Sequence, residues 1–210
     1  MVIAIDGPAG SGKSTIAKLI AEKLSIEFLN SGSFYRGVTY FCLKNNISLK
    51  DAEKICECAK NLKLDYKNSH LFINNEDVEK FLRTAEVDSN VAQVSAIVPL
   101  RHIINEKLRD LTHSLSFVCE GRDMTTVVFP QAEYKFYLDA SLEVQAQRRF
   151  NQKLTNQTLD EIREIIKMRD EIDKNKAEGA LKIADDALYI DTSHLTIEQV
   201  CEIILHKIYV

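Results

Sequence analysis

A glycine-rich segment close to the first strand-like run combines a lysine and a serine in a spacing that suits phosphate binding. The segment Gly7-Pro8-Ala9-Gly10-Ser11-Gly12-Lys13-Ser14 matches the pattern G-x-x-x-x-G-K-[ST] in full. It lies between an apolar run, residues 2–6, and a stretch with helical spacing, residues 14–24. Glycines let the backbone curl so that successive N–H groups face one anion, and the following helix adds its positive end. The segment therefore predicts a phosphate-binding loop.

The side chains around this loop predict what it holds. Lys13 can bridge the outer phosphates of a nucleoside triphosphate, and the Ser14 hydroxyl can ligate Mg²⁺. Arg148 and Arg149 could also reach these phosphates, but adjacent helix residues face different ways, so we expect only Arg148 to do so. The predicted triphosphate-binding residues are Gly7, Pro8, Ala9, Gly10, Ser11, Gly12, Lys13, Ser14, Thr15 and Arg148.

The loop does not identify the reaction, because GTP-binding switches, ATP-driven motors and small-molecule kinases all share it. A GTPase would normally add an N-K-x-D motif, whereas Asn175-Lys176 continues here as Ala177-Glu178. The residues that hold the acceptor must therefore decide the function.

Four further segments have residue types more typical of a binding site than of packing. They are residues 30–36 after the second apolar run, Arg101 after a helical run, residues 120–123 at the end of the third apolar run, and residues 169–173 in a charged region. Arginine grips phosphate with paired hydrogen bonds, and open parallel sheets bind ligands outside the carboxyl ends of their strands. We expect these segments to form the acceptor site.

The elements that must position these residues alternate along the chain. Short apolar runs are expected as buried strands, and stretches with helical spacing separate them. This alternation predicts an α/β fold with a parallel sheet covered on both faces. The expected strands are residues 2–6, 27–30, 117–119, 134–138 and 188–190, and the clearest helical stretches are residues 14–24 and 142–153.

Two regions depart from this alternation. Residues 64–78 alternate at period two around the turn-prone Lys67-Asn68-Ser69-His70, which predicts a small antiparallel hairpin, followed by helices at residues 78–82 and 85–98. Residues 159–176 are strongly charged and helical in spacing. That pattern suits a solvent-facing, mobile lid, and a plain solvated helical hairpin is the alternative.

Composition narrows the class of protein. The 210 residues are 45% hydrophobic and 28% charged, with a net charge of −4, which predicts one folded domain without a basic surface for nucleic acid. No apolar run approaches the roughly 20 residues that a membrane helix needs. The 5 cysteines form no C-x-x-C pair, and no basic leader precedes the first apolar run. We expect a cytoplasmic protein, and a monomer because no exposed apolar helix face is obvious.

At this point the sequence resembles the bacterial cytidylate kinases, the CMP/dCMP members of the nucleoside monophosphate kinases. The resemblance runs from about residue 2 to residue 205. Its most specific part is Gly121-Arg122-Asp123-Met124 followed by Val127-Val128-Phe129-Pro130. The other matching segments are residues 5–14, Ser31-Gly32 with Tyr35-Arg36, residues 138–141, Arg169-Asp170 with Asp173, and Asp186-Ala187 followed by Ile190-Asp191-Thr192.

The resemblance implies a P-loop kinase with a five-stranded parallel sheet flanked by helices, a small antiparallel-sheet insert for the acceptor, and a helical lid. The implied parts of the single kinase domain are a core of residues 1–35, 100–150 and 180–210, an insert of about 36–99, and a lid of about 151–179. The implied reaction is ATP-dependent phosphorylation of CMP and dCMP with Mg²⁺.

The resemblance also implies roles for the acceptor residues. Arg36 and Arg122 would hold the acceptor phosphate, Arg101 and Asp123 would read the cytosine edge, and Ser31 would support the base-binding arginine. Arg169 and Asp173 would contact ribose or phosphate from the lid. The residues implied in catalysis are Lys13, Arg122 and Arg169, and those implied in CMP binding are Ser31, Arg36, Arg101, Arg122, Asp123, Arg169 and Asp173.

These roles suit the chemistry. An acceptor phosphate is already ionised at neutral pH, so no general base is required and catalysis reduces to alignment and charge neutralisation. The cytosine N4 amino group donates to a carboxylate, whereas uracil presents a carbonyl at the same place. We therefore expect Asp123 to disfavour UMP.

Alternatives stay open at several positions. Asp123 could form a structural salt bridge with Arg122 or Arg101, and Arg36 and Arg101 could be ordinary surface residues. The chain also departs from the family pattern: aspartate is usual at Asn30 and Glu120, glycine at Thr125, and arginine at Ile172 and Lys176. The alternative functions are a P-loop kinase for UMP or another small acceptor, and a non-catalytic nucleotide-binding regulator. The preference between CMP and dCMP stays undecided.

Overall fold

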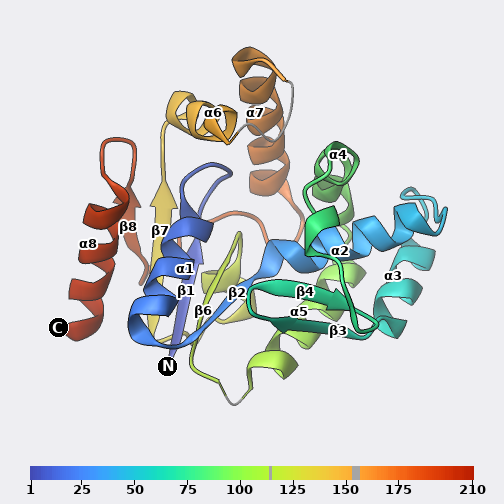
Figure 1. Ribbon diagram of the computed structural model, residues 1–210, viewed down its shortest axis with the longest axis horizontal. Coiled ribbons are helices and arrows are strands. Elements are labelled where there is room, and N and C mark those ends of the chain that lie inside the picture. Colours follow the sequence, from blue (N-terminus) through green and yellow to red (C-terminus); the bar gives the residue numbers. More distant parts are fainter. Residues whose placement is uncertain (114, 153–156) are drawn as a thin grey trace. The chain divides into compact units, whose positions relative to one another are not determined.

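A parallel sheet with the strand order β2-β6-β1-β7-β8 carries the phosphate loop. The computed structural model describes residues 1–113, 115–152 and 157–210. All five expected strands are confirmed, and the last three extend slightly further than expected. The strands are β1 (Val2–Asp6), β2 (Glu27–Asn30), β6 (Phe117–Gly121), β7 (Tyr134–Asp139) and β8 (Leu188–Asp191) (Figure 1).

The chain divides into two compact units, one of residues Met1–Phe28 with Leu115–Val210 and the other of residues Leu29–Ser114. In the first unit, helices α1 (Lys13–Leu24) and α8 (Ile197–Tyr209) pack on the sheet. The core between them is apolar, as a strand covered on both faces requires. Its fully buried members include Ile3, Ile5, Ile20, Phe136, Leu138 and Ile204.

Two further helices of the first unit lie beyond the sheet, α6 (Leu142–Asn151) and α7 (Leu159–Asn175) (Figure 1). They pack on each other through Ala146, Ile162 and Ile166. Helix α7 begins with a capping box, in which Thr158 and Glu161 satisfy each other's backbone N–H groups. This confirms the helix expected at residues 159–176, whereas the expected end of the preceding helix, Lys153, lies outside the described residues.

One premise of the sequence analysis is wrong in α7. Ile165, Met168 and Ile172 are exposed and recur at the i, i+3, i+7 spacing of one helix face. These apolar residues are interspersed among the many charged residues of the helix. The monomer expectation, which used the absence of such a face, therefore loses that support and stays a prediction.

The second unit joins helices to a three-stranded antiparallel sheet of order β3-β4-β5. Its two turns place Asn68 and Ser69, then Asn74 and Asn75, at positive φ, a conformation that asparagine tolerates better than most residues. The hairpin expected at residues 64–78 is thus confirmed and gains a third strand. The elements are α2 (Ser31–Lys44), α3 (Ala52–Asn61), β3 (Leu64–Lys67), β4 (His70–Ile73), β5 (Glu76–Asp77), η1 (Glu79–Phe81), α4 (Ala85–Val94) and α5 (Val98–Thr112).

The single helix expected at residues 85–98 is instead two helices. Helix α4 ends at Val94, and α5 begins at Val98 with Pro99 in its first turn, where the missing N–H of proline costs nothing. Arg101 therefore belongs to the start of α5 rather than to a segment that follows a helix.

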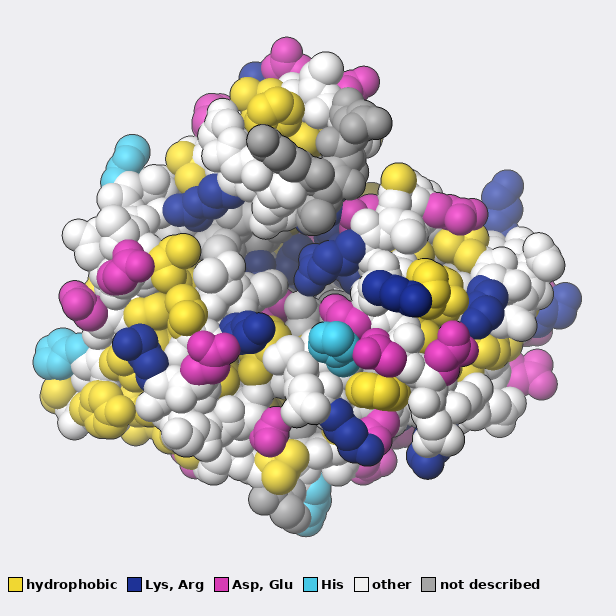
Figure 2. Space-filling view, in the orientation of Figure 1, with side chains coloured by type: hydrophobic (Ala, Val, Ile, Leu, Met, Phe, Trp, Pro, Cys, Tyr) yellow, Lys and Arg dark blue, Asp and Glu magenta, His cyan; other side chains and the backbone are white. Residues whose placement is uncertain are grey.

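Charged side chains of both signs are interspersed on the face seen in Figure 2. Among the helices of the described residues, none combines the length and apolar composition needed to cross a membrane.

Candidate functional site

Two glycines allow the phosphate loop to pack closely against the elements around it. A Cβ at Gly7 would lie 1.9 Å from the carbonyl oxygen of Leu138 at the end of β7, so no larger residue fits there without a backbone shift. At Gly10, where φ is +75°, a Cβ would lie 2.9 Å from the backbone of Gln145 in α6. The spacing of the loop's glycines thus follows from two close backbone approaches as well as from phosphate binding.

Lys13 lies inside this loop. Its Nζ donates to the carbonyl oxygen of Pro8 at 2.5 Å and lies 3.4 Å from the Ser11 hydroxyl, and the residue is only 5% exposed. Burial, and secondarily the charges of Arg122 and Arg169, lower the pKa of Lys13 to about 7, against the opposing influence of Glu120 and Asp170. A buried ammonium that faces other cations is poised to gain an anionic ligand.

Ser14 follows Lys13 and contacts an acidic residue from the neighbouring strand. Its hydroxyl donates to Oε1 of Glu120, which lies at the end of β6, at 2.7 Å. Hydroxyl and carboxylate oxygens are the hard ligands that Mg²⁺ prefers, with phosphate oxygens and water completing its shell. The pair therefore suits a magnesium ion bound together with a triphosphate.

Arg148 and Arg149 of α6 have different hydrogen-bond partners. The two terminal nitrogens of Arg148 donate to the hydroxyl of Thr192 at 2.9 Å and to its carbonyl oxygen at 2.6 Å, and the Thr192 hydroxyl lies 3.1 Å from the Ser11 carbonyl oxygen. Arg149 donates to Gln152 instead. Arg148 is thus held beside the phosphate loop.

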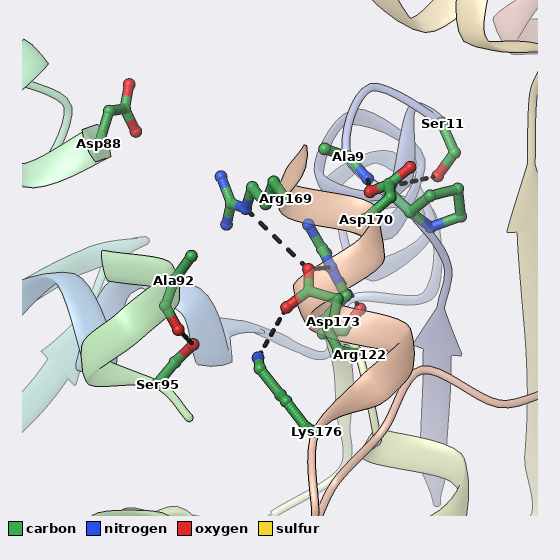
Figure 3. Close-up of polar contacts among 12 residues, drawn as sticks. Ala9, Ser11, Asp88, Ala92, Ser95, Arg122, Arg169, Asp170, Asp173 and Lys176 are labelled. Carbon is green, nitrogen blue, oxygen red and sulfur yellow. Dashed lines mark hydrogen bonds and ion pairs between the residues drawn. The ribbon is translucent and has the colours of Figure 1, made fainter. Parts of the chain in front are cut away.

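The carboxylate of Asp173 in α7 gathers three cations (Figure 3). Nε of Arg122 donates to it at 2.8 Å, Nζ of Lys176 at 2.6 Å, and Nε of Arg169 lies 4.0 Å away. Burial alone would raise the pKa of Asp173, but Arg122, Lys176 and Arg169 outweigh it and hold the pKa well below its usual value. This contact joins α7 to the segment that follows β6.

A second carboxylate of α7 faces the phosphate loop. Oδ1 of Asp170 accepts the backbone N–H of Ala9 at 3.3 Å (Figure 3). Burial raises the pKa of Asp170, and the Ala9 N–H and the charge of Arg122 oppose that rise. Asp170 was not among the predicted site residues, although its position directly after Arg169 could have indicated it.

The cluster around Asp173 predicts a pH-dependent stability. Because the folded-state pKa is lowered, the ionised carboxylate stabilises the fold above its unfolded pKa of about 3.9, and this stabilisation is lost as the pH falls further. Asp173→Asn should lower the free energy of unfolding by about 3 kcal/mol at pH 7, as breaking a buried pair does. Chemical denaturation of both proteins at pH 7, 5 and 3 checks this; a difference that does not shrink at pH 3 contradicts it.

Asp6 ends β1 immediately before the phosphate loop and is fully buried. Its Oδ1 accepts the N–H of Met124 at 2.9 Å, and its Oδ2 accepts the N–H and hydroxyl of Thr125 at 2.7 and 2.6 Å. Met124 and Thr125 begin a π-helical turn, η2 (Met124–Val128), directly after Arg122 and Asp123. Asp123 is 2% exposed.

The acceptor residues predicted in the second unit lie on α2 and α5. Arg36 donates to the carbonyl oxygen of Leu82 at 3.0 Å and forms an ion pair with Asp88 of α4. Ser31 begins α2 and is 3% exposed. Arg36 is buried, and a buried charged side chain needs polar partners such as these. The alternative of an ordinary surface residue is therefore wrong for Arg36.

Arg101 is equally deep. It is 2% exposed, its guanidinium lies 5.5 Å from the centre of the Tyr35 ring, and one terminal nitrogen donates to the Ser95 carbonyl oxygen at 2.9 Å. The alternative of a neutral surface residue is therefore wrong for Arg101 as well. The guanidinium also makes a cation–π contact with the Tyr35 ring.

Comparison with known proteins gives the same family throughout the chain. The sequence model described as cytidylate kinase matches residues 3–209. A cytidylate kinase of Clostridioides difficile is 42% identical over 99% of this chain and 98% of its own length. One from Fusobacterium nucleatum is 40% identical over 99% of this chain and 97% of its own length.

A solved structure supports the fold. The shikimate kinase of Bacteroides thetaiotaomicron superposes with a TM-score of 0.53 at 12% identity, covering 100% of this chain and 99% of its own. At that identity the similarity concerns the fold alone, which is that of a P-loop kinase.

Proposed function

Because the chain belongs to the cytidylate kinase family, we propose that it transfers the γ-phosphoryl group of ATP to CMP and dCMP, with Mg²⁺ bound to the ATP. The observation that supports the proposal most strongly is that the phosphate loop and the Arg122-Asp123 segment begin at the ends of two neighbouring strands, β1 and β6. Asp6 of β1 pairs in register with Gly121 of β6, so the phosphate loop and the Arg122-Asp123 segment leave the sheet side by side. Phosphoryl donor and acceptor then meet outside the carboxyl ends of the strands.

The donor side follows from the loop. Backbone N–H groups of the loop and the Lys13 ammonium bind the β- and γ-phosphates, while Arg148 reaches the same triphosphate from α6. Ser14, with Glu120 behind it, would hold Mg²⁺, which when bound supplies charge neutralisation between the β- and γ-phosphates. The loop would thus orient the triphosphate and neutralise its charge, and none of its groups would need to exchange a proton.

On the acceptor side, a CMP phosphate oxygen attacks the γ-phosphorus. Arg122 and Arg36 hold the CMP phosphate, and Arg169 neutralises the charge of the phosphoryl group in transfer. Arg101 and Asp123 bind the cytosine edge with support from Ser31, and Asp173 contacts the ribose. Alignment and electrostatic stabilisation then supply the rate enhancement.

These roles divide the chain by task. We assign residues 1–35, 100–150 and 180–210 to the core of the kinase domain, about 36–99 to the acceptor-binding insert and about 151–179 to the lid. Residues 153–156 of the lid lie outside the described residues. Closure of lid and insert over the nucleotides would exclude water, which could otherwise accept the phosphoryl group.

Asp123→Asn should weaken the preference for CMP over UMP. A carboxylate accepts from the cytosine N4 amino group, whereas an amide can also donate to the uracil carbonyl, so the kcat/KM ratio of CMP to UMP should fall by about 1–3 kcal/mol, or roughly 5- to 150-fold. Steady-state kinetics with both acceptors measures this, and an unchanged ATP KM is the internal control. An unaltered CMP/UMP ratio would assign Asp123 a structural role instead.

An acceptor panel tests the proposed function. Coupled ADP release should be measured with CMP, dCMP, UMP, AMP and shikimate as acceptors. We expect turnover with CMP and dCMP well above that with the other three. Faster turnover with UMP would favour the UMP-kinase alternative, and the absence of acceptor-dependent ADP release would favour a nucleotide-binding regulator.

A further inference from the structure

We propose that Asp6 is a positioning residue that aligns the acceptor-binding segment with the phosphate loop. The inference rests on the proposed function, because it concerns the placement of Arg122 and Asp123. Asp6 itself is fully buried, and its role is to fix the backbone from which these two side chains project.

The geometry connects the two segments through one side chain. The backbone of Asp6 leads directly into Gly7, the first residue of the phosphate loop, while its carboxylate binds Met124 and Thr125. Three hydrogen bonds of 2.6 to 2.9 Å therefore hold the start of η2 relative to the loop. A displacement of about 1 Å in a substrate-positioning group can cost about 10²-fold in rate, so such a connection matters for transfer.

A contribution to the stability of the fold does not by itself explain a carboxylate at position 6. A fully buried charge is costly unless it is paired with an opposite charge, and the hydrogen bonds that Asp6 accepts come from neutral N–H and O–H donors. Among the partners, the Thr125 hydroxyl adds a third donor to the two backbone N–H groups. The hydroxyl offsets part of the free-energy cost of burying the Asp6 carboxylate, and it also restrains η2.

The surroundings predict when this carboxylate is ionised. Burial raises the pKa of Asp6 to about 6, against the lowering influence of Thr125 and Met124. The titratable groups that face it are Asp123, whose charge also raises this pKa, Cys119 of β6 and Tyr137 of β7. Below pH 6 the protonated group should accept hydrogen bonds less well, so the alignment should weaken.

Stability should follow the opposite trend. Because the folded-state pKa of Asp6 is raised, the stability from its protonated form is complete below pH 3.8 and is lost as the pH rises through about 6. Asp6→Asn should therefore be at least as stable as the unmodified chain at pH 8 while it is less active. A residue with a structural role only would lose stability and activity together.

The test compares Asp6→Asn with Thr125→Val and Thr125→Ser. At pH 8, Asp6→Asn should lower kcat/KM for CMP about 10²-fold, because the amide N–H₂ opposes an N–H donor, while the Kd for ATP stays within about 2-fold. Thr125→Val should cost about 10-fold through one lost hydrogen bond to a charged group, and Thr125→Ser should restore the rate. Between pH 8 and pH 5, the kcat/KM ratio of the unmodified chain to Asp6→Asn should fall towards 1, a comparison that cancels the ionisation of CMP itself.

Two results would overturn the inference. One is an Asp6→Asn variant whose kcat/KM for CMP stays within about 3-fold of the original at pH 8. The other is a loss of activity in Asp6→Asn that is accompanied by a lowered Tm or by weakened ATP binding. Failure of the unmodified chain to phosphorylate CMP would instead refute the proposed function, so the two failures are distinguishable.

Discussion

Lys13→Met should lower kcat for phosphoryl transfer to CMP by about 10²–10³-fold, with a smaller effect on the KM for CMP. The ammonium is the cation closest to the chemistry inside the loop, and removing one preorganised donor to a developing charge typically costs about 10²–10³-fold. The Lys13 ammonium is buried in the loop, with Nζ 2.5 Å from the Pro8 carbonyl oxygen. Rapid-quench measurement of the chemical step checks the expected loss.

Stability separates this effect from unfolding. Since burial lowers the pKa of Lys13 to about 7, the cost of burying its charge is complete below pH 7 and fades as the pH rises towards 10.5. Lys13→Met removes that cost, so its Tm at pH 7 should equal or exceed that of the unmodified chain. Lys18→Met, on the exposed face of the same helix, is the matched control and should retain full activity. A turnover loss of less than about 10-fold in Lys13→Met would contradict the role given to Lys13.

Arg122→Ala should reduce kcat/KM for CMP by about 10³-fold, and Arg122→Lys by about 10²-fold. Lysine keeps the charge but loses the planar fork, which can hold an acceptor phosphate with two parallel hydrogen bonds while Nε binds Asp173. In Arg122→Ala, kcat should fall and KM for CMP should rise, because Arg122 both holds the CMP phosphate and orients the attacking oxygen. Steady-state kinetics with CMP as the varied substrate gives both constants.

The control for this pair lies on the lid helix. Arg163 of α7 is half-exposed and pairs only with Asp160 and Glu164 among the contacts described for it, so Arg163→Ala should change kcat/KM by less than about 2-fold. Equal, small effects of Arg122→Lys and Arg163→Ala would mean that Arg122 serves the ion pair with Asp173 rather than the acceptor.

The sheet and the donor loop follow closely from local sequence signals. Each expected strand is an apolar run that ends at or just before polar residues, and the sheet buries its central strand most fully, as Ile3 and Ile5 of β1 show. The phosphate loop needs only its own spacing and its two neighbouring elements. Each of these patterns lies within a few consecutive residues, so it can be recognised without knowledge of the tertiary contacts.

The polar network of the site does not follow in the same way. Asp6 binds Met124 and Thr125, residues far along the chain, and no periodicity in the sequence encodes that pairing. Asp170 contacts Ala9, 161 residues away in the sequence, and Arg148 contacts Thr192, 44 residues away. The charge of Arg36 and Arg101 suggested surface positions as alternatives, because burial depends on partners that only the fold supplies.

The transfer itself is the central claim, and a single-turnover experiment tests it most directly. The enzyme in excess should be mixed with ATP carrying a labelled γ-phosphate and with CMP, and the products separated over the first turnover. We predict that the label appears as the β-phosphate of CDP in amounts equal to the ADP formed. Label that remains in ATP, or that appears as inorganic phosphate without CDP, would contradict the account.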